Sequence, residues 1–142
     1  MEHPFTKDYD AIPGNDPMSW ANRFDTARWR ILAAYAGGQH VGGAVVVPAA
    51  SRIVLLWDLR VSPRFRRTGV ASALFAATEQ WAAVQACTQI RVETQNINLP
   101  ACRFYERQGC ELESVDANAY PTLPREVQLM WCKRGVGGVS AT

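Results

Sequence analysis

The sequence has few of the side chains that metal enzymes and histidine-dependent enzymes use. It contains only two histidines, His3 and His40, and both lie far from the motifs described below. The cysteines are not spaced as metal ligands usually are. Since the chain shows no export signal, we expect them to be reduced thiols rather than disulfides. The four are Cys87, Cys102, Cys110 and Cys132. This composition predicts no metal site.

The chain also has no long apolar run, and its charges nearly cancel. No segment is apolar over the length that a transmembrane helix needs, and the opening residues MEHPFTKDYD lack the apolar centre of a signal peptide. The net charge of +2 argues against a nucleic-acid partner. The 48% of hydrophobic and 20% of charged residues are typical of a globular protein. We expect one cytoplasmic domain with no membrane or nucleic-acid partner, and a homodimer remains open.

Hydrophobic patterns predict strands that alternate with helices. Residues before about Asp25 indicate a loop, with a short helix around Ser19–Phe24. A helix is predicted after Gly69, and a second over Leu99–Gln108. The first has an apolar stripe at spacings of three and four, made of Val70, Leu74, Ala77, Trp81 and Val84. The predicted strands are Trp29–Ala36, Val41–Val47, Ile53–Val61, Gln89–Thr94, Cys110–Val115 and Val127–Cys132.

These elements predict the α+β class. Two strand–helix–strand passages occur within a sheet that is otherwise antiparallel, so the sheet should be mixed. We expect a single domain over residues 1–134 and a flexible tail over residues 135–142, whose sequence is GVGGVSAT.

The most informative stretch is residues 55–73, where a strand leads into a helix through an arginine-rich turn. Backbone N–H groups at a helix N-terminus are unpaired, and the helix dipole adds positive potential. Gly69 and Ala71 keep side chains out of the way, so an anion can approach these groups closely. The surrounding arginines are Arg60, Arg64, Arg66 and Arg67. The pattern predicts a pyrophosphate site.

A second motif follows the strand predicted over Gln89–Thr94. Asn98 is a natural helix N-cap, and Pro100 is tolerated in the first helical turn. Asn98, Ala101 and Tyr105 lie about one turn apart and therefore share one face of the helix.

Together the two motifs resemble those of the GNAT acetyltransferase superfamily. The run R-x-x-G-x-A at residues 66–71 is similar to its Q/R-x-x-G-x-G/A signature. The run N-x-x-A-x-x-x-Y-x-x-x-G at residues 98–109 is similar to its second segment, with Cys110 replacing the usual aromatic residue. Residues 93–131 resemble the C-terminal half of the streptothricin acetyltransferases. The resemblance implies one GNAT domain, a mixed and mostly antiparallel sheet flanked by helices, here with a shortened N-terminal part.

The resemblance also implies acetyl-CoA as co-substrate. By analogy, the backbone of Leu59 and Val61 would pair with the pantetheine arm, and the Val61 N–H would stabilise the developing oxyanion. The expected cofactor-binding residues are Leu59, Arg60, Val61, Arg66, Arg67, Thr68, Gly69, Val70, Ala71, Ser72, Asn98, Ala101 and Tyr105.

Direct acetyl transfer to an amine needs a base and an acid. An amine of pKa about 10.4 must lose a proton before it attacks a thioester, and a carboxylate can accept that proton. Asp58 and Glu93 are the candidates, because their strands should be neighbours. Each carboxylate could instead hold a cationic acceptor, or be a solvated or ion-paired strand residue. By resemblance, Tyr105 would protonate the departing thiolate, with core packing as the alternative role.

The acceptor expected from the resemblance is a cationic small molecule with a primary amine, such as the β-lysine amine of streptothricin. The segment from Glu106 to Glu126 carries five acidic residues and two basic ones, which suits a cation. The expected acceptor-binding residues are Asp58, Glu93, Asp116, Tyr120 and Glu126. The alternatives are another small amine, a protein lysine, or a CoA-binding regulatory module without turnover.

Overall fold

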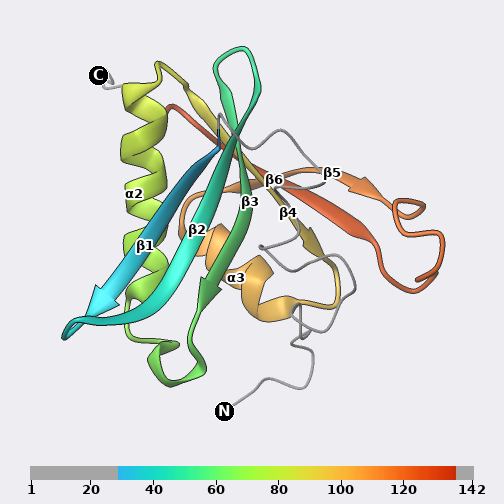
Figure 1. Ribbon diagram of the computed structural model, residues 1–142. Helices are drawn as coiled ribbons and strands as arrows, with labels where there is room; N and C mark the ends of the chain where they lie inside the picture. The colour runs from blue at the N-terminus through green and yellow to red at the C-terminus, as the bar shows by residue number, and fades with distance from the viewer. Residues whose placement is uncertain (1–28, 137–142) are drawn as a thin grey trace.

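The computed structural model describes residues 29–136. Six strands and two longer helices follow one another along this part of the chain (Figure 1). The strands are β1 (Arg30–Ala36), β2 (Gln39–Ala50), β3 (Ile53–Val61), β4 (Gln89–Gln95), β5 (Glu111–Asp116) and β6 (Gln128–Arg134). The helices are the short 3-10 helix η2 (Pro63–Phe65), α2 (Val70–Val84) and α3 (Leu99–Arg107). The helix expected around Ser19–Phe24 lies outside the described residues.

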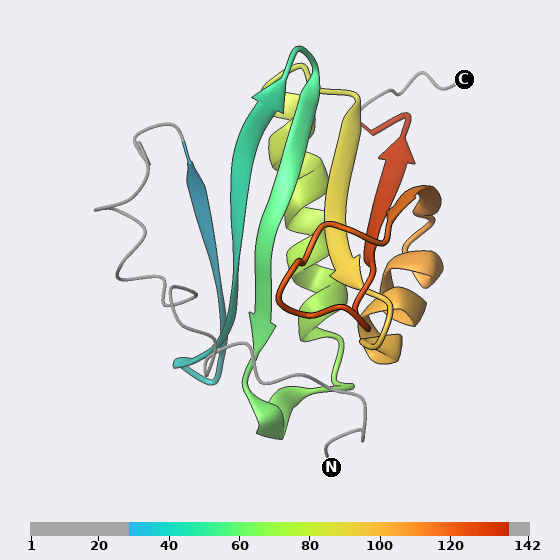
Figure 2. The ribbon, with the colours of Figure 1, turned by 90° about the vertical axis from the view of Figure 1, so that its right-hand side faces the viewer.

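The strands form one mixed sheet in the order β1-β2-β3-β4-β6-β5. Only β3 and β4 are parallel, and the other neighbouring strands are antiparallel. Helix α2 lies against one face of the sheet (Figure 2). Helix α3 is on the same side, because the Phe75 ring of α2 lies 6.3 Å from the Phe104 ring and 6.1 Å from the Tyr105 ring. The α+β class and the mixed, mostly antiparallel sheet are confirmed.

The core fills the space between this face of the sheet and α2. Its most buried apolar side chains come from β2, β3, α2 and β4, and none is more than 2% exposed: Val46, Val54, Leu56, Phe75 and Ile90. Val136 is 3% exposed, and its N–H donates a hydrogen bond to the Thr88 carbonyl at 3.0 Å. The described chain is therefore packed against the sheet as far as Val136.

The buried face of α2 differs from the predicted apolar stripe. Its fully buried side chains are Leu74, Phe75, Thr78 and Ala82, while Val70 and Trp81 of the predicted stripe pack against the core and stay partly exposed. Val84, which the stripe included, is 78% exposed. Thr78 is fully buried because its hydroxyl donates to the Leu74 carbonyl at 2.9 Å, which satisfies the polar group within the helix. A helix face predicted from apolar residues alone leaves out such a threonine, although its side chain is buried.

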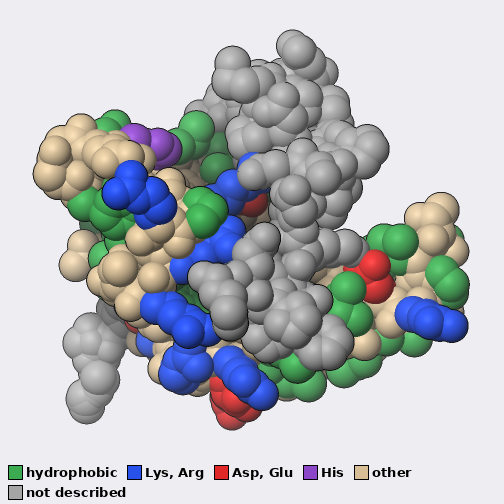
Figure 3. All heavy atoms as spheres, turned by 90° about the horizontal axis from the view of Figure 1, so that it is seen from below, with side chains coloured by type: hydrophobic (Ala, Val, Ile, Leu, Met, Phe, Trp, Pro, Cys, Tyr) green, Lys and Arg blue, Asp and Glu red, His purple; other side chains and the backbone are tan. Residues whose placement is uncertain are grey.

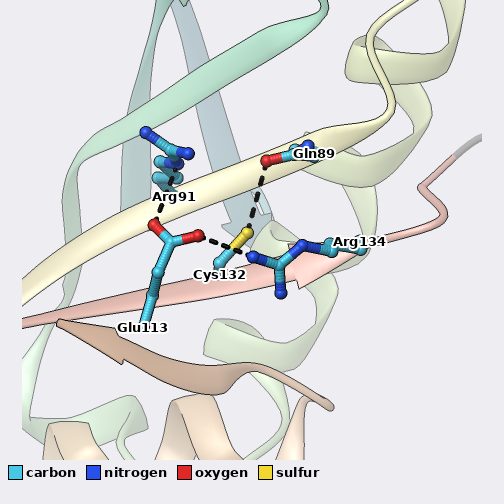
Figure 4. Close-up of polar contacts among 5 residues, drawn as sticks. All are labelled: Gln89, Arg91, Glu113, Cys132 and Arg134. Atoms are coloured by element: carbon cyan, nitrogen blue, oxygen red, sulfur yellow. Dashed lines mark hydrogen bonds and ion pairs between the residues drawn. The ribbon is translucent and has the colours of Figure 1, made fainter.

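A single carboxylate links β5 to two other strands. A register shift between Leu112 and Ser114 leaves Glu113 as an extra residue in β5. Its carboxylate pairs with Arg91 Nε of β4 at 3.2 Å and with Arg134 Nη2 of β6 at 2.7 Å (Figure 4). Because β6 lies between β4 and β5, this pair of contacts spans three strands.

Candidate active site

The site is built where β3 and β4 separate. The two strands pair in parallel only from Ile53–Leu56 of β3 to Gln89–Val92 of β4. A register shift against β2 then leaves Trp57 as an extra residue, and such a bulge bends and twists its strand. From Trp57 onward, β2 is the only strand of the described chain that pairs with β3. Figure 2 shows β3 and β4 diverging toward their lower ends.

The free edge of β3 carries backbone hydrogen-bonding groups. The Ser62 N–H donates to the Val41 carbonyl of β2 at 2.8 Å. Since successive N–H groups along a strand point to opposite edges, the Val61 N–H points away from β2, and so does the N–H of Leu59. An extended acyl chain lying in the gap could therefore pair with β3 as a short additional strand.

The turn between β3 and α2 has an unusual backbone. The Phe65 N–H donates to the Ser62 carbonyl at 2.8 Å, and the Thr68 hydroxyl donates to the Phe65 carbonyl. Arg67 has φ of 64° and Gly69 has φ of 91°, two positive values that lie two residues apart. Such conformations in a residue other than glycine are costly and cluster at ligand-binding sites.

The N-terminus of α2 fits a diphosphate group. Helix α2 begins at Val70 with no side-chain cap and no acidic residue in its first turn. A β-carbon placed on Gly69 would have no heavy atom of the described chain within 4 Å, so the space above the turn is open. Arg64, Arg66 and Arg67 are exposed around it. Figure 3 shows basic side chains gathered on the face seen from below, where this turn lies. The turn thus combines free N–H groups, the helix dipole and positive charge.

Helix α3 places the second motif beside α2. The Asn98 side chain caps α3 by accepting from the Ala101 N–H at 3.2 Å, as an N-cap should. Tyr105 is 6% exposed, and its ring lies 5.1 Å from that of Phe104. At the end of α3, the Gln108 amide donates to the Ser72 hydroxyl of α2 at 3.2 Å. Gln108 was not among the residues expected from the sequence, although its contact with Ser72 links the two expected cofactor motifs.

The two candidate bases have different partners. Arg60 Nε donates to both oxygens of Asp58, at 3.0 and 2.9 Å. Glu93 instead accepts a hydrogen bond from the Tyr120 hydroxyl. Gln95, two residues along β4 from Glu93, donates to the same hydroxyl at 3.3 Å. Both carboxylates lie on the sheet face away from α2 and α3, because Leu59, next to Asp58, and Val92, next to Glu93, pack into the core. Within residues 29–136 Glu93 forms no ion pair, so of the two candidates it is the carboxylate whose charge is not neutralised there.

The other expected acceptor residues lie around the β5–β6 loop. Asp116 Oδ1 accepts from the Asn118 N–H at 2.8 Å, which is a local turn. Glu126 is only 9% exposed. Of the expected acceptor set, the structure brings Glu93 and Tyr120 into direct contact. Gln95 was missed, although its position two residues from Glu93 puts both on one face of the strand.

Two negative observations hold for residues 29–136. No group of three His, Cys, Asp or Glu side chains in this range is arranged to hold a metal ion. No helix in the same range is long and apolar enough to cross a membrane.

Curated proteins with similar sequences include streptothricin acetyltransferases. Streptothricin acetyltransferase A of Bacillus subtilis (strain 168) is 32% identical over 79 residues, which are 54% of this chain and 46% of that protein. The streptothricin acetyltransferase of Escherichia coli is 28% identical over 131 residues, or 90% of this chain and 70% of that protein. The chain thus spans about half the length of the Bacillus subtilis relative.

Solved structures with a similar fold also include acetyltransferases. A Bacillus anthracis (strain Ames) protein assigned as a streptothricin acetyltransferase, in complex with acetyl coenzyme A, matches with a TM-score of 0.75 and 28% identity over 84% of this chain and 70% of its own. Nourseothricin acetyltransferase matches with a TM-score of 0.71 and 26% identity, over 77% of this chain and 66% of its own. The profile of the acetyltransferase (GNAT) family covers residues 2–110. The expected GNAT fold is confirmed, and the chain belongs to the acetyltransferase (GNAT) family.

Proposed function

We propose that this protein transfers the acetyl group of acetyl-CoA to a primary amine of a cationic small molecule, with streptothricin as the specific acceptor. The observation that carries the proposal is the gap between β3 and β4, with an open helix N-terminus on one side and Glu93 on the other. The structure of the Bacillus anthracis relative contains acetyl coenzyme A, and two curated relatives are named for streptothricin.

The chain offers acetyl-CoA three sets of contacts. The backbone of Leu59 and Val61 would hold the pantetheine arm, and the first turn of α2 from Gly69 to Ser72 would hold the pyrophosphate. Arg66 and Arg67 would add charge, while α3 with Ala101 and Tyr105 would flank the arm. Acetyl-CoA would supply the activated thioester, and the Val61 N–H would donate to its carbonyl oxygen.

Glu93 is the better base of the two candidates. Arg60 occupies both oxygens of Asp58, so accepting a proton there would break an ion pair. Glu93 is exposed on the face away from the helices, where an amine can reach it. Asp58 would then shape the charge of the site rather than take the proton, and Tyr105 would donate a proton to the departing thiolate.

The acceptor is tested by incubating the purified protein with acetyl-CoA and measuring thiol release over a panel of amines. The panel contains streptothricin, a lysine peptide and an uncharged arylamine. We expect streptothricin to be acetylated with the highest kcat/KM. Glu93→Gln should lower kcat by about 100- to 10,000-fold, the range for a lost general base. Asp58→Asn, the matched control, should lower kcat much less.

Each other outcome points to a different function. Efficient acetylation of the arylamine without any of streptothricin would remove this acceptor but keep the acetyltransferase. Tight CoA binding with no transfer to any amine would favour a regulatory module.

A further inference from the structure

We propose that Tyr120 is a positioning residue, which holds the Glu93 carboxylate in the orientation that accepts the proton of the amine. This inference rests on the proposed function and assigns a specific role to the β5–β6 loop, residues 117–127. In Figure 2 this loop crosses in front of β4, on the side away from α2. It brings Tyr120 to a carboxylate that lies 27 positions earlier in the chain.

The loop is fixed to the end of β4 by its last residues. The Asn96 N–H donates to the Val127 carbonyl at 2.9 Å, and the Asn96 side chain accepts from the Val127 N–H at 2.8 Å. Two turns then lead back to Tyr120. The Glu126 N–H donates to the Leu123 carbonyl, and the Leu123 N–H donates to the Tyr120 carbonyl, each at 2.9 Å. Tyr120 is therefore held by a chain of backbone bonds that starts three residues after Glu93.

The hydrogen bonds at the Tyr120 hydroxyl can run in one direction only. The Gln95 Nε2 group is a donor without acceptor capacity, so the Tyr120 oxygen must accept from it. The hydroxyl proton is then free to point to Glu93 Oε2, which accepts it. Gln95 thus orients Tyr120, and Tyr120 orients Glu93.

This arrangement leaves half of the carboxylate for the substrate. Oε1 of Glu93 accepts no hydrogen bond from residues 29–136. An exposed glutamate otherwise samples many rotamers, and fixing it beforehand removes that entropic cost from the reaction. Tyr120 therefore acts through Glu93 and does not itself need to touch the acceptor.

The test is a double-mutant cycle on the active enzyme. Tyr120→Phe keeps the ring and removes the hydroxyl, so kcat for the best acceptor should fall by about 10- to 100-fold, a fraction of the value of a general base. The KM for acetyl-CoA should not change, since the cofactor turn lies on another part of the molecule. Tyr35→Phe is the matched control, because Tyr35 is 66% exposed on β1. That change should have no effect.

Measuring Tyr120→Phe in a Glu93→Gln variant distinguishes a positioning role of Tyr120 from a merely structural one. If Tyr120 acts only through Glu93, adding Tyr120→Phe to Glu93→Gln should change kcat by less than about twofold, because the two effects are not additive. Gln95→Met, which removes the orienting amide, should lower kcat in the parent and likewise add nothing to Glu93→Gln. Thermal unfolding of each variant checks that the fold is kept.

Three results would overturn the inference. An active parent whose Tyr120→Phe variant keeps kcat within about twofold refutes positioning and leaves the proposed function intact. An equal further loss in the Glu93→Gln background would show that Tyr120 acts independently of Glu93. A parent that acetylates no amine overturns the proposed function and this inference together.

Discussion

Tyr105 packs in the core and is also the proposed proton donor to the departing thiolate. Its ring contacts Phe75 and Phe104, and the residue is 6% exposed, so truncating it would disturb the core. Tyr105→Phe keeps the ring and should change the free energy of unfolding by only about 0.5–1.5 kcal/mol. If the hydroxyl protonates the thiolate, kcat should fall by about 100- to 10,000-fold while acetyl-CoA affinity stays the same. Steady-state kinetics beside calorimetry would measure both; unchanged turnover would show that Tyr105 serves packing alone.

Cys110 gives the protein a pH-dependent stability at alkaline pH. Burial raises the pKa of its thiol from 9.0 to about 11, with Lys133 opposing the shift. The raised pKa means that the folded state favours the neutral thiol. Its contribution to stability is therefore complete below pH 9 and is lost as the pH rises toward 11.

Cys110→Ala should remove this dependence. The free energy of unfolding of the parent minus that of the variant should shrink between pH 9 and about 11, measured by urea titration at several pH values. Cys87→Ala, at a partly exposed cysteine, is the control and should keep the parent's pH dependence. A difference that stays constant with pH would contradict the prediction.

Among single residues, local interactions could be predicted from the sequence, whereas long-range contacts could not. Asn98 was predicted as an N-cap from its residue type, and the structure confirms it, because capping is a local interaction. The contact between Glu93 and Tyr120 joins two elements through a loop whose path depends on the β5–β6 register. No local pattern encodes that register, so the sequence could propose both residues for the site but not their contact.

At the level of elements, an acidic substitution in the first turn of α2 should have opposite effects on helix stability and on the proposed cofactor binding. An acidic side chain near a helix N-terminus stabilises the helix by about 0.3–1 kcal/mol. The same charge would repel a pyrophosphate. Ala71→Glu should therefore keep or raise the Tm and strongly weaken acetyl-CoA binding in calorimetry. Ala71→Gln, of equal size but neutral, should weaken binding less.

Gly69 is a poorer position for this test. Its φ of 91° would strain any other residue, so loss of binding there could reflect a distorted turn. Unchanged acetyl-CoA affinity in a folded Ala71→Glu variant would exclude the α2 N-terminus as the pyrophosphate site.

The elements themselves were largely predictable. Strand β3 has the predicted bounds, because apolar and polar residues alternate from Trp57 to Val61 and Pro63 follows its end. Strand β2 continues to Ala50, three residues beyond its predicted end, because it keeps pairing with β3 up to Ile53. The bulge at Trp57 was not predicted, since it depends on how two strands share their hydrogen bonds rather than on either sequence.

At the scale of the whole molecule, the two halves of the proposed site lie on opposite faces of the sheet. The α2 N-terminus and its arginines belong to the side covered by helices, whereas Glu93 and Tyr120 belong to the other. The order of the motifs predicted a pyrophosphate site and a nearby carboxylate. It could not predict that the two would meet only through the gap between β3 and β4, because this arrangement follows from strand order.

The separation of β3 and β4 has a kinetic consequence for the proposed reaction. If acetyl-CoA enters the gap from the helix side and the amine from the opposite side, neither molecule obstructs the other's way in or out. Both can then bind in either order before transfer, and the two products can depart independently. The enzyme should follow a sequential mechanism without a compulsory order, in which CoA competes with acetyl-CoA but not with the amine.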